Sequence, residues 1–289
     1  MRLSQLSATL LVAVALSGCS VGIGGYLGNN ETGELAQNIG TDTASYQVVD
    51  LDSGVITQRE TIPDLTSDPA YRTSRLVFRR VAGGSESTGA AVSEIGAQGD
   101  ETKADVQVTH FYIAVFEITQ AQWVRLTTRA GATSSPWSTV TPVNVVSGVG
   151  DSYPAWGLSR QVVERALAAQ PGTARMALPS ETQWEVAARG DTTTAFWWGD
   201  DPDEATVTTR ARVVETNGGG SGPTLVGSLT PNPLGLYDIA GNVWELTASG
   251  ALRGGSWHDT VYQARSANRL TIDTSTAHAL VGVRPILVP

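Results

Sequence analysis

The pattern of apolar and polar residues changes several times along this chain of 289 residues. An apolar run covers residues 10–16, and small and polar residues without a period continue to residue 45. From residue 46 onward, segments of alternating apolar residues are mixed with segments whose apolar residues recur every three to four positions. Alternation is typical of half-buried strands, and the second spacing is typical of amphipathic helices. The pattern therefore predicts one mixed α+β domain behind an irregular N-terminal region.

Strands are predicted in the first half of this domain. Residues 46–58 alternate around an Asp-Ser-Gly turn, which favours a β-hairpin. A second strand is predicted over residues 76–81, ending at a Gly-Gly pair, and residues 110–116 alternate again. Residues 85–105 are small and polar, and we expect them to form an exposed loop.

Three helices are predicted from their capping residues. The first is capped by Thr119, and the second starts near Ser159. The third has the capping-box pair Ser180 and Gln183 and is closed by Gly190. After Gly190 we expect no helix longer than one turn. The apolar positions expected on these helices are Trp123, Val124, Leu126, Val162, Val163, Ala166, Leu167, Trp184, Ala187 and Ala188.

Residues 1–19 have the layout of a lipoprotein signal peptide. Arg2 supplies a positive charge before the apolar run, and Leu16-Ser17-Gly18-Cys19 matches a lipobox, whose cysteine is acylated. The run is far shorter than the ~20 residues of a membrane-spanning helix. A plain secretory signal with an incidental cysteine is the alternative.

The same segment predicts a localisation. Ser20 after the cysteine resembles lipoproteins sorted to the outer membrane. We therefore expect lipid anchoring to the bacterial cell envelope, in the outer membrane. Residues 20–45 are predicted to be a flexible tether, residues 46–74 an N-terminal hairpin and leader segment, and residues 75–289 the main domain.

Composition narrows the class of protein further. A hydrophobic content of 41% with eight Trp supports a real core, and 31 Gly with only 16% charged residues predicts many loops. The net charge is −9 and no run of Lys and Arg occurs, so nucleic acid is not an expected partner. A disulfide is excluded because Cys19 is the only cysteine.

Several sequence blocks occur in a fixed order after residue 110. They include an Arg-Gly-Gly-Ser-Trp block and a Tyr-Asp-Ile-Ala-Gly-Asn-Val-Trp-Glu block. The set resembles the sulfatase-modifying-factor family, the relatives of formylglycine-generating enzyme. This resemblance implies a C-type-lectin-like α+β fold with few helices and much irregular structure. The blocks are residues 111–123, 178–190 with 198–200, 232–245, 253–257, 265–269 and 282–284.

The family's catalytic chemistry depends on thiols that this chain lacks. The resemblance places two copper-binding cysteines shortly after the Arg-Gly-Gly-Ser block, where Asp259 and Ala264 stand here. Soft thiolates suit Cu(I) and exchange with a substrate thiol, whereas a carboxylate and a methyl group do neither. The sequence therefore argues against copper binding and against formylglycine formation.

A second enzymatic branch of the family uses non-haem iron held by clustered histidines. The histidines of this chain are His110, His258 and His278, far apart in sequence and without a His-x3-His-x-Glu pattern. His258 lies beside Asp259, but an isolated pair of this kind is usual on a surface. Iron is therefore not expected.

A structural calcium ion is the cofactor that the resemblance favours. The family holds Ca²⁺ within the Tyr-Asp…Trp-Glu block, where this chain offers Asp238, Gly241, Val243 and Glu245. Two carboxylates and backbone carbonyls on a tight turn suit a hard cation that takes six to eight oxygen ligands. The alternative is that Asp238 and Glu245 accept hydrogen bonds from loop N–H groups. The family's other calcium position is lost at residues 211–213.

The remaining scaffold predicts a binding module that is not a catalyst. We expect the C-terminal loops to bind a protein, peptide or glycan at the cell envelope, with the membrane contacted through the lipid anchor only. Alternatives are a family enzyme with altered oxidoreductase or maturation chemistry on an exported substrate, a diversified variable protein of a retroelement, and an envelope assembly partner. The candidate ligand-binding residues are Trp257, His258, Asp259, Thr260, Tyr262, Leu270, Ile272 and His278.

Overall fold

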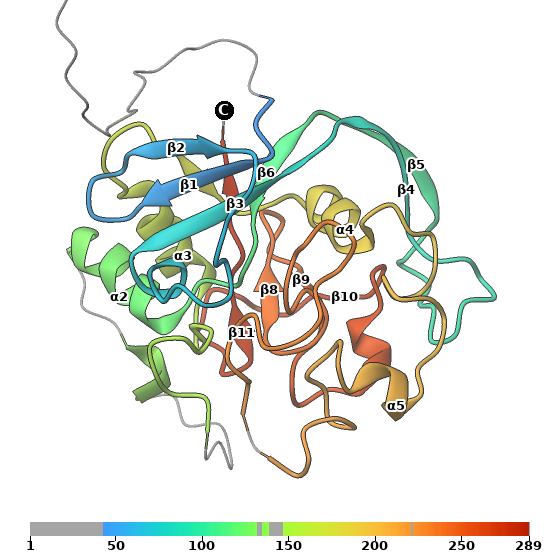
Figure 1. Cartoon of the computed structure of the whole chain (residues 1–289). Helices are drawn as coiled ribbons and strands as arrows, with labels where there is room; N and C mark the ends of the chain where they lie inside the picture. Colours follow the sequence, from blue (N-terminus) through green and yellow to red (C-terminus); the bar gives the residue numbers. More distant parts are fainter. Residues whose placement is uncertain (1–42, 132–134, 139–146, 221, 289) are drawn as a thin grey trace, which may run out of the picture. The chain divides into compact units, whose positions relative to one another are not determined.

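The structure, a computed structural model, describes residues 43–131, 135–138, 147–220 and 222–288 (Figure 1). The predicted signal peptide, Cys19 and the tether up to residue 42 lie outside the described residues. Residues 43–45, which were also assigned to the tether, lie on the domain, where the buried Ala44 accepts a hydrogen bond from the Tyr112 hydroxyl at 2.6 Å. Within the described ranges, no helix has the length and apolar character needed to cross a membrane.

The largest sheet contains six antiparallel strands in the order β2-β1-β3-β6-β12-β7. The predicted hairpin is present, with Tyr46 opposite Arg59. Strand β12, from the end of the chain, lies between β6 and β7, so the sheet joins both ends of the domain. The strands are β1 (Tyr46–Asp50), β2 (Ile56–Arg59), β3 (Arg75–Val81), β6 (Phe111–Ala114), β7 (Met176–Ala177) and β12 (Ile286–Leu287).

Three longer helices start where the sequence predicts. The Thr119 hydroxyl accepts from the Gln122 N–H while the Gln122 amide oxygen accepts from the Thr119 N–H, and Ser180 with Gln183 repeats this capping box. Of the apolar positions expected on the first helix, Trp123 and Leu126 are buried and Val124 is 41% exposed. The helices are α2 (Gln120–Arg129), α3 (Arg160–Ala168) and α4 (Glu181–Arg189), with single turns at α1 (Ala70–Thr73), η1 (Pro136–Ser138), α5 (Glu204–Val207) and η2 (Val261–Ala264).

The predicted exposed loop at residues 85–105 is partly a β-hairpin. Strands β4 (Gly84–Thr88) and β5 (Ala104–Val108) pair in an antiparallel arm that runs along the right-hand side of Figure 1. The prediction was wrong because the arm carries few apolar residues and is held by side chains distant in sequence. The Gly89 N–H, for example, donates to Glu185 of α4 at 2.7 Å.

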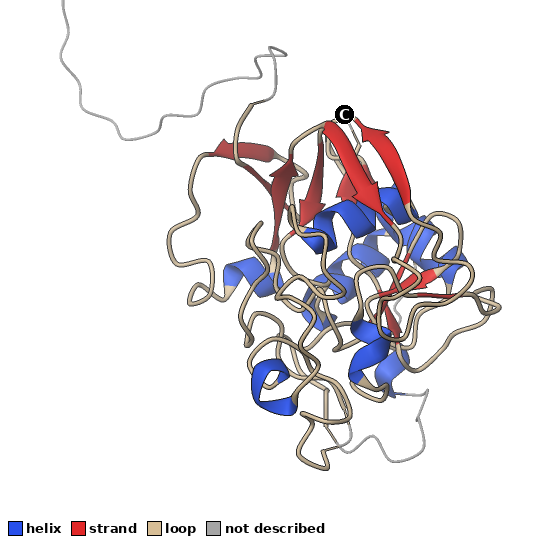
Figure 2. Cartoon of the chain, turned by 90° about the vertical axis from the view of Figure 1, so that its right-hand side faces the viewer, coloured by secondary structure: helices blue, strands red, loops and turns tan. Residues whose placement is uncertain are grey.

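The C-terminal third is mostly loop, as Figure 2 shows by its tan segments. Its short strands form a sheet in the order β10-β9-β8-β11, in which β11 is parallel to β8. Among the described residues, the helical segments after Gly190 are four residues long, which confirms the expectation of no longer helix there. The strands are β8 (Trp244–Leu246), β9 (Leu252–Arg253), β10 (Arg269–Leu270) and β11 (Val281–Gly282).

Core side chains cover both faces of the six-stranded sheet. Phe78 and Leu76 join Trp123 in one cluster, and Val77 joins Trp184 in a second cluster on the other face. Strand β6 is buried at all four positions because it lies between β3 and β12 with a cluster on each side. The predicted alternation at residues 110–116 therefore does not correspond to one solvent-exposed face.

Candidate functional site

The Arg-Gly-Gly-Ser block is an internal anchor for the loop that follows it. Arg253 is buried and donates to Glu185 at 2.6 Å and to the Ala267 carbonyl at 3.0 Å. Gly254 has a φ of +90°, and a Cβ there would lie 3.1 Å from the Trp184 ring. Glycine is therefore required for this close approach. The block anchors the base of the loop of residues 258–263, in which His258, Thr260 and Tyr262 are exposed.

The two positions of the family thiols lie at the ends of this loop. The Asp259 carboxylate accepts a hydrogen bond from the Ser256 hydroxyl, and the Asp259 carbonyl accepts one from the Val214 N–H at 2.9 Å. Ala264 is buried in η2. Neither side chain offers a soft ligand or a group that exchanges electrons.

Five of the candidate ligand-binding residues are exposed. Tyr262 is 38% and Leu270 is 37% exposed. Ile272 is half-buried and packs against the larger core cluster. Trp257 is only 4% exposed, so it supports the loop from inside and does not present a face to a ligand. The exposed members are His258, Thr260, Tyr262, Leu270 and His278, and Asp259 is half-buried.

The candidate residues belong to two segments with different neighbours. Around Tyr262, the loop contacts the tip of the β4–β5 arm, where a Cβ on Gly96 would lie 3.5 Å from the tyrosine ring. The segment 270–279 lies beside the start of α3, where the Arg160 N–H donates to the Thr274 carbonyl at 2.8 Å. The structure therefore gives two patches, and the contacts do not join them into one site.

One buried arginine fixes the arm beside the first patch. The Arg265 guanidinium donates to Glu94 at 2.8 Å, to Glu101 at 2.7 Å and to the Gly96 carbonyl at 2.7 Å. The partners lie 164 to 171 residues away in sequence. Sequence reasoning placed Arg265 in a family block but missed its partners, because no local signal in the arm marks them.

The predicted calcium residues Asp238 and Glu245 are both buried, and Glu117 is a third buried carboxylate that interacts with them. Asp238 is 1% exposed, its Oδ2 accepts from the Gly227 N–H at 2.6 Å, and its Oδ1 has no partner among the described residues. Burial raises the pKa of Asp238 to about 6. Burial, reinforced by the Asp238 and Glu245 charges, raises the pKa of Glu117 well above its usual value.

The predicted calcium ligands make other contacts. Both oxygens of Glu245 accept from Arg284, and Oε2 also accepts from the Trp184 indole at 2.6 Å. No group of three or more His, Cys, Asp or Glu side chains is arranged for a metal within the part of the chain that the structure describes. Glu245 thus fits the role of an ion-pair anchor. Asp238 Oδ1 is the one buried oxygen of this pair left open to a cation.

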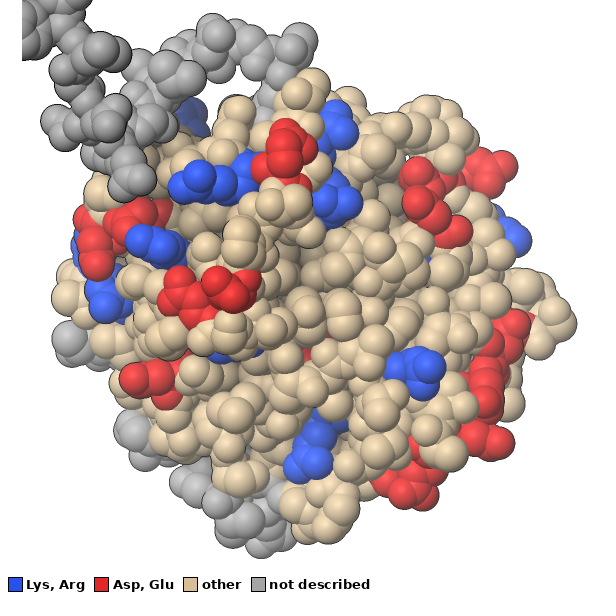
Figure 3. Space-filling model, in the orientation of Figure 1, with Lys and Arg blue, Asp and Glu red and all other residues tan. Residues whose placement is uncertain are grey.

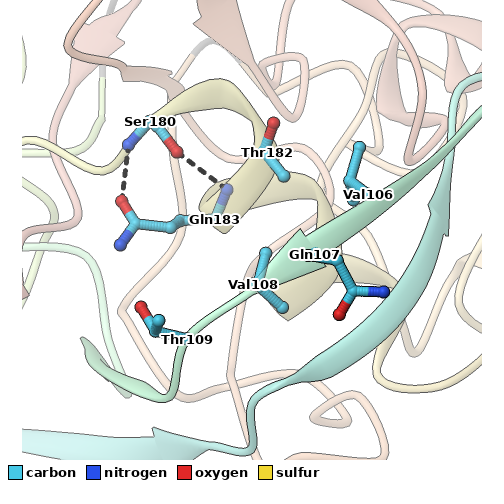
Figure 4. A pocket seen from close by; sticks show the side chains of 7 residues that line it. All are labelled: Val106, Gln107, Val108, Thr109, Ser180, Thr182 and Gln183. Carbon is cyan, nitrogen blue, oxygen red and sulfur yellow. Dashed lines mark hydrogen bonds between the residues drawn. The ribbon is translucent and has the colours of Figure 1, made fainter.

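A surface hollow of about 580 Å³ lies between β5 and the start of α4 (Figure 4). Its lining carries hydroxyl and amide groups and no charged side chain, and the Ser180 hydroxyl and Gln183 are already engaged in the capping box. It shares no lining residue with the loops after Arg253. We therefore do not assign the function to it. The lining residues are Val106, Gln107, Val108, Thr109, Ser180, Thr182 and Gln183.

Short sheets joined by long loops, with a buried Arg-Gly-Gly-Ser block, define a domain of the sulfatase-modifying-factor type. The sequence matches the Sulfatase-modifying factor enzyme 1-like domain over residues 64–288, and the chain belongs to this family. It is 34% identical to a formylglycine-generating enzyme of Thermomonospora curvata over 115 residues, which cover 36% of this chain and 37% of that protein. It is 33% identical to the inactive C-alpha-formylglycine-generating enzyme 2 of Bos taurus over 127 residues, 37% of this chain and 42% of that protein. The chain therefore matches less than half the length of these relatives.

Two solved structures share the fold. PvdO from Pseudomonas aeruginosa superposes with a TM-score of 0.61 and 22% identity, covering 74% of this chain and 94% of PvdO. The Treponema denticola variable protein 1 gives a TM-score of 0.61 and 19% identity, covering 74% and 96% of the two chains. These likenesses confirm the predicted C-type-lectin-like α+β fold.

Proposed function

We propose that this chain is a lipid-anchored envelope protein whose domain binds a protein, peptide or glycan and does not form formylglycine. The observation that carries the proposal is the loss of both family thiols from an otherwise intact scaffold. Asp259 and Ala264 stand at those positions, and the only cysteine of the chain is Cys19, in the lipobox. An acylated Cys19 leaves the mature chain without any thiol.

The contacts at these two positions support a structural role. The Asp259 carboxylate closes the turn after Ser256, and Ala264 packs into the core beside Val261. The Cu(I) of the family reaction needs thiolate ligands, and the reaction also needs a thiol that pairs with the substrate cysteine. The chain therefore lacks both the metal ligands and the exchanging group of that reaction.

The exposed side chains after the Arg-Gly-Gly-Ser block support a binding role. His258 and Tyr262 extend from a loop whose base is fixed by Arg253 and Arg265. Rigid scaffolds that carry exposed aromatic residues on loops are common at interfaces. Since Leu270 and His278 lie on a separate segment, each patch is tested separately.

Two loop variants test the proposal. The first replaces His258 and Tyr262 by Ser, and the second replaces Leu270 and His278 by Ser. The control replaces Val55 and Val124 by Ser; both are exposed and lie outside the loops that follow Arg253. We expect all three to keep the wild-type melting temperature, because exposed substitutions change stability by less than about 0.5 kcal/mol. At least one loop variant should lose the partner that wild type retains after cross-linking in intact cells, identified by mass spectrometry.

The outcomes are distinct. Retention of the same partner by both loop variants would contradict the proposed binding face. Unfolding of a loop variant would mean that its residues belong to the core. Loss of the partner in the control variant as well would contradict the proposal, because the loss would then not be specific to these loops.

A further inference from the structure

One end of the six-stranded sheet carries a row of arginines. Tyr46 lies opposite Arg59 on one side and Arg79 on the other, so the three side chains share one face of β2, β1 and β3. Arg80 follows on β3, opposite Tyr112 of β6, and strand alternation places its side chain on the other face of the same end of the sheet. Figure 3 shows blue side chains gathered at the top of the view, over these strands.

The row continues across the sheet to its far edge. Tyr112 lies opposite Leu287 of β12, and Leu287 lies opposite Met176, the first residue of β7. Arg175 directly precedes Met176, so it stands at the same end of the sheet as Arg80. We call Arg59, Arg79, Arg80 and Arg175 the arginine rim. It is assembled from two strands, β2 and β3, and the residue before a third, β7, which explains why the sequence shows no long run of basic residues.

The rim arginines lack carboxylate partners, unlike most other arginines of the domain. Within the described residues, no ion pair involves a rim arginine. By contrast, an ion pair with Glu is formed by each of Arg189, Arg253, Arg265 and Arg284. Arg59 and Arg175 are exposed. The Nε atoms of Arg79 and Arg80 are buried without a hydrogen-bond acceptor. Glu60, beside Arg59, accepts from the Ser45 hydroxyl and offsets one of the four positive charges.

Two of the rim arginines also contact the chain close to its first described residue. The Ser45 carbonyl accepts from the Arg79 guanidinium at 3.4 Å and from the Arg80 N–H at 3.0 Å. About 24 residues separate Cys19 from Thr43. A flexible linker of that length spans about 27 Å on average, so an anchor at Cys19 would keep this end of the sheet near the bilayer.

We propose that the arginine rim contacts the anionic phospholipid headgroups of the membrane that carries the anchor. This inference rests on the lipid anchoring of the proposed function and adds a contact beyond the anchor alone. Guanidinium groups bind phosphate with two parallel hydrogen bonds, and the exposed Arg59 and Arg175, which have no carboxylate partner, supply donors for them. The net charge of the chain is −9, so an anionic surface attracts it only where basic side chains gather without carboxylate partners, as they do at the rim.

Footprinting of arginines on the full-length wild-type protein tests the proposal. The protein is added to vesicles of phosphatidylglycerol or of phosphatidylcholine, treated with a dicarbonyl reagent, and analysed by peptide mass spectrometry. We expect phosphatidylglycerol to slow modification of Arg59 and Arg175 about fivefold, which corresponds to ~1 kcal/mol per basic residue at an anionic surface. Protection should disappear at molar salt, where the Debye length is about 3 Å.

Internal controls are available in the same molecule. Arg75 lies at the opposite end of β3, about 17 Å from Arg80 along the strand. Arg210 follows α5. Both should be modified equally on the two kinds of vesicle. A variant with Arg59→Gln and Arg175→Gln should also lose the protection of Arg79, whereas a matched Arg75→Gln, Arg210→Gln variant should keep it.

Three outcomes would overturn the proposal. They are equal modification of the rim on both vesicles, equal protection of Arg75 and Arg210, and protection by a DNA duplex without protection by phosphatidylglycerol. Sedimentation with phosphatidylcholine vesicles reports the anchor separately. A protein that stays in the supernatant there would count against lipid anchoring, while its footprint on phosphatidylglycerol would still decide the role of the rim.

Discussion

Arg284 and Glu245 form an ion pair in which both side chains are at most 1% exposed, with Nη2 and Oε1 2.8 Å apart. The same guanidinium donates to the backbone carbonyls of Ala114, Val115 and Tyr237. It thereby ties strand β6 and the Tyr-Asp block to β8. Its positive charge also attracts the carboxylates of Glu117 and Asp238. One buried guanidinium therefore interacts with three buried carboxylates.

Breaking this pair is expected to be strongly destabilising. Glu245→Gln should lower the free energy of unfolding by about 3–5 kcal/mol, because the buried guanidinium loses its partner. The control is Asp52→Asn in the exposed Arg125–Asp52 pair, with an expected loss of at most about 1 kcal/mol. Urea unfolding measures both. Equal losses in the two variants would contradict a buried, poorly solvated pair.

Stability should fall as the pH rises from 5 to 7.5. The pKa of Asp238 is raised by burial to about 6, above its usual 3.8, so the folded state binds this proton more tightly than the unfolded state. The contribution is fully present below pH 3.8 and is lost as the pH passes 6. Glu117 acts in the same direction. Melting temperatures at the two pH values measure the effect, and Asp238→Asn should reduce it. A higher melting temperature at pH 7.5 than at pH 5 would refute the assignment.

Calcium binding remains a prediction for Asp238 and Glu245. At pH 7.5, calcium at a hundred times its dissociation constant should raise the melting temperature by about 5–10 °C. The shift should be smaller at pH 5, where protons compete for Asp238. A variant with Asp238→Ala and Glu245→Ala should lose it, and Asp238→Asn provides a milder test if that variant does not fold. No response of the wild-type protein to calcium would leave both residues as loop anchors.

The protein should not form formylglycine. Purified full-length protein with Cu(I) is expected to leave a Cys-x-Pro-x-Arg peptide unchanged, because Asp259 and Ala264 replace the thiols. Mass spectrometry of the peptide detects the aldehyde. A double variant with Asp259→Cys and Ala264→Cys tests whether the scaffold still positions a copper site. Aldehyde produced by the wild-type chain above a reaction without protein would contradict the assignment.

Lipidation at Cys19 is tested in cells. The wild-type protein should incorporate labelled fatty acid and fractionate with membranes, because the lipobox cysteine is acylated. Cys19→Ala should take up no label and should appear as soluble or uncleaved protein. Ser17→Thr serves as a control that keeps the cysteine. A membrane-bound Cys19→Ala protein together with an unlabelled wild type would exclude the lipoprotein assignment.

Local signals were sufficient for the elements that carry their own stabilising contacts. Thr119 with Gln122 and Ser180 with Gln183 form their capping boxes within four residues, so the sequence alone placed two helix starts. Gly190 ends α4 in the left-handed conformation that its position predicted.

Features held by distant contacts were not visible in the sequence. The β4–β5 arm depends on Arg265, whose partners lie more than 160 residues away. Trp257 and Ile272 were among the candidate ligand-binding residues, yet Trp257 is buried and Ile272 is half-buried against the larger core cluster. Burial inside loops depends on tertiary packing, which a pattern of single residues does not report.

The central position of β12 has a consequence for how the domain forms. Ile286 lies between Ile113 and Ala177, so β6 and β7 are joined only through a strand that follows both of them in the sequence. Until that strand is in place, two adjacent strand edges and the apolar side chains around them have no partner. The six-stranded sheet can therefore close only after β12 has been synthesised. Loss of a few C-terminal residues would open the sheet in its interior, with far greater effect than trimming an edge strand.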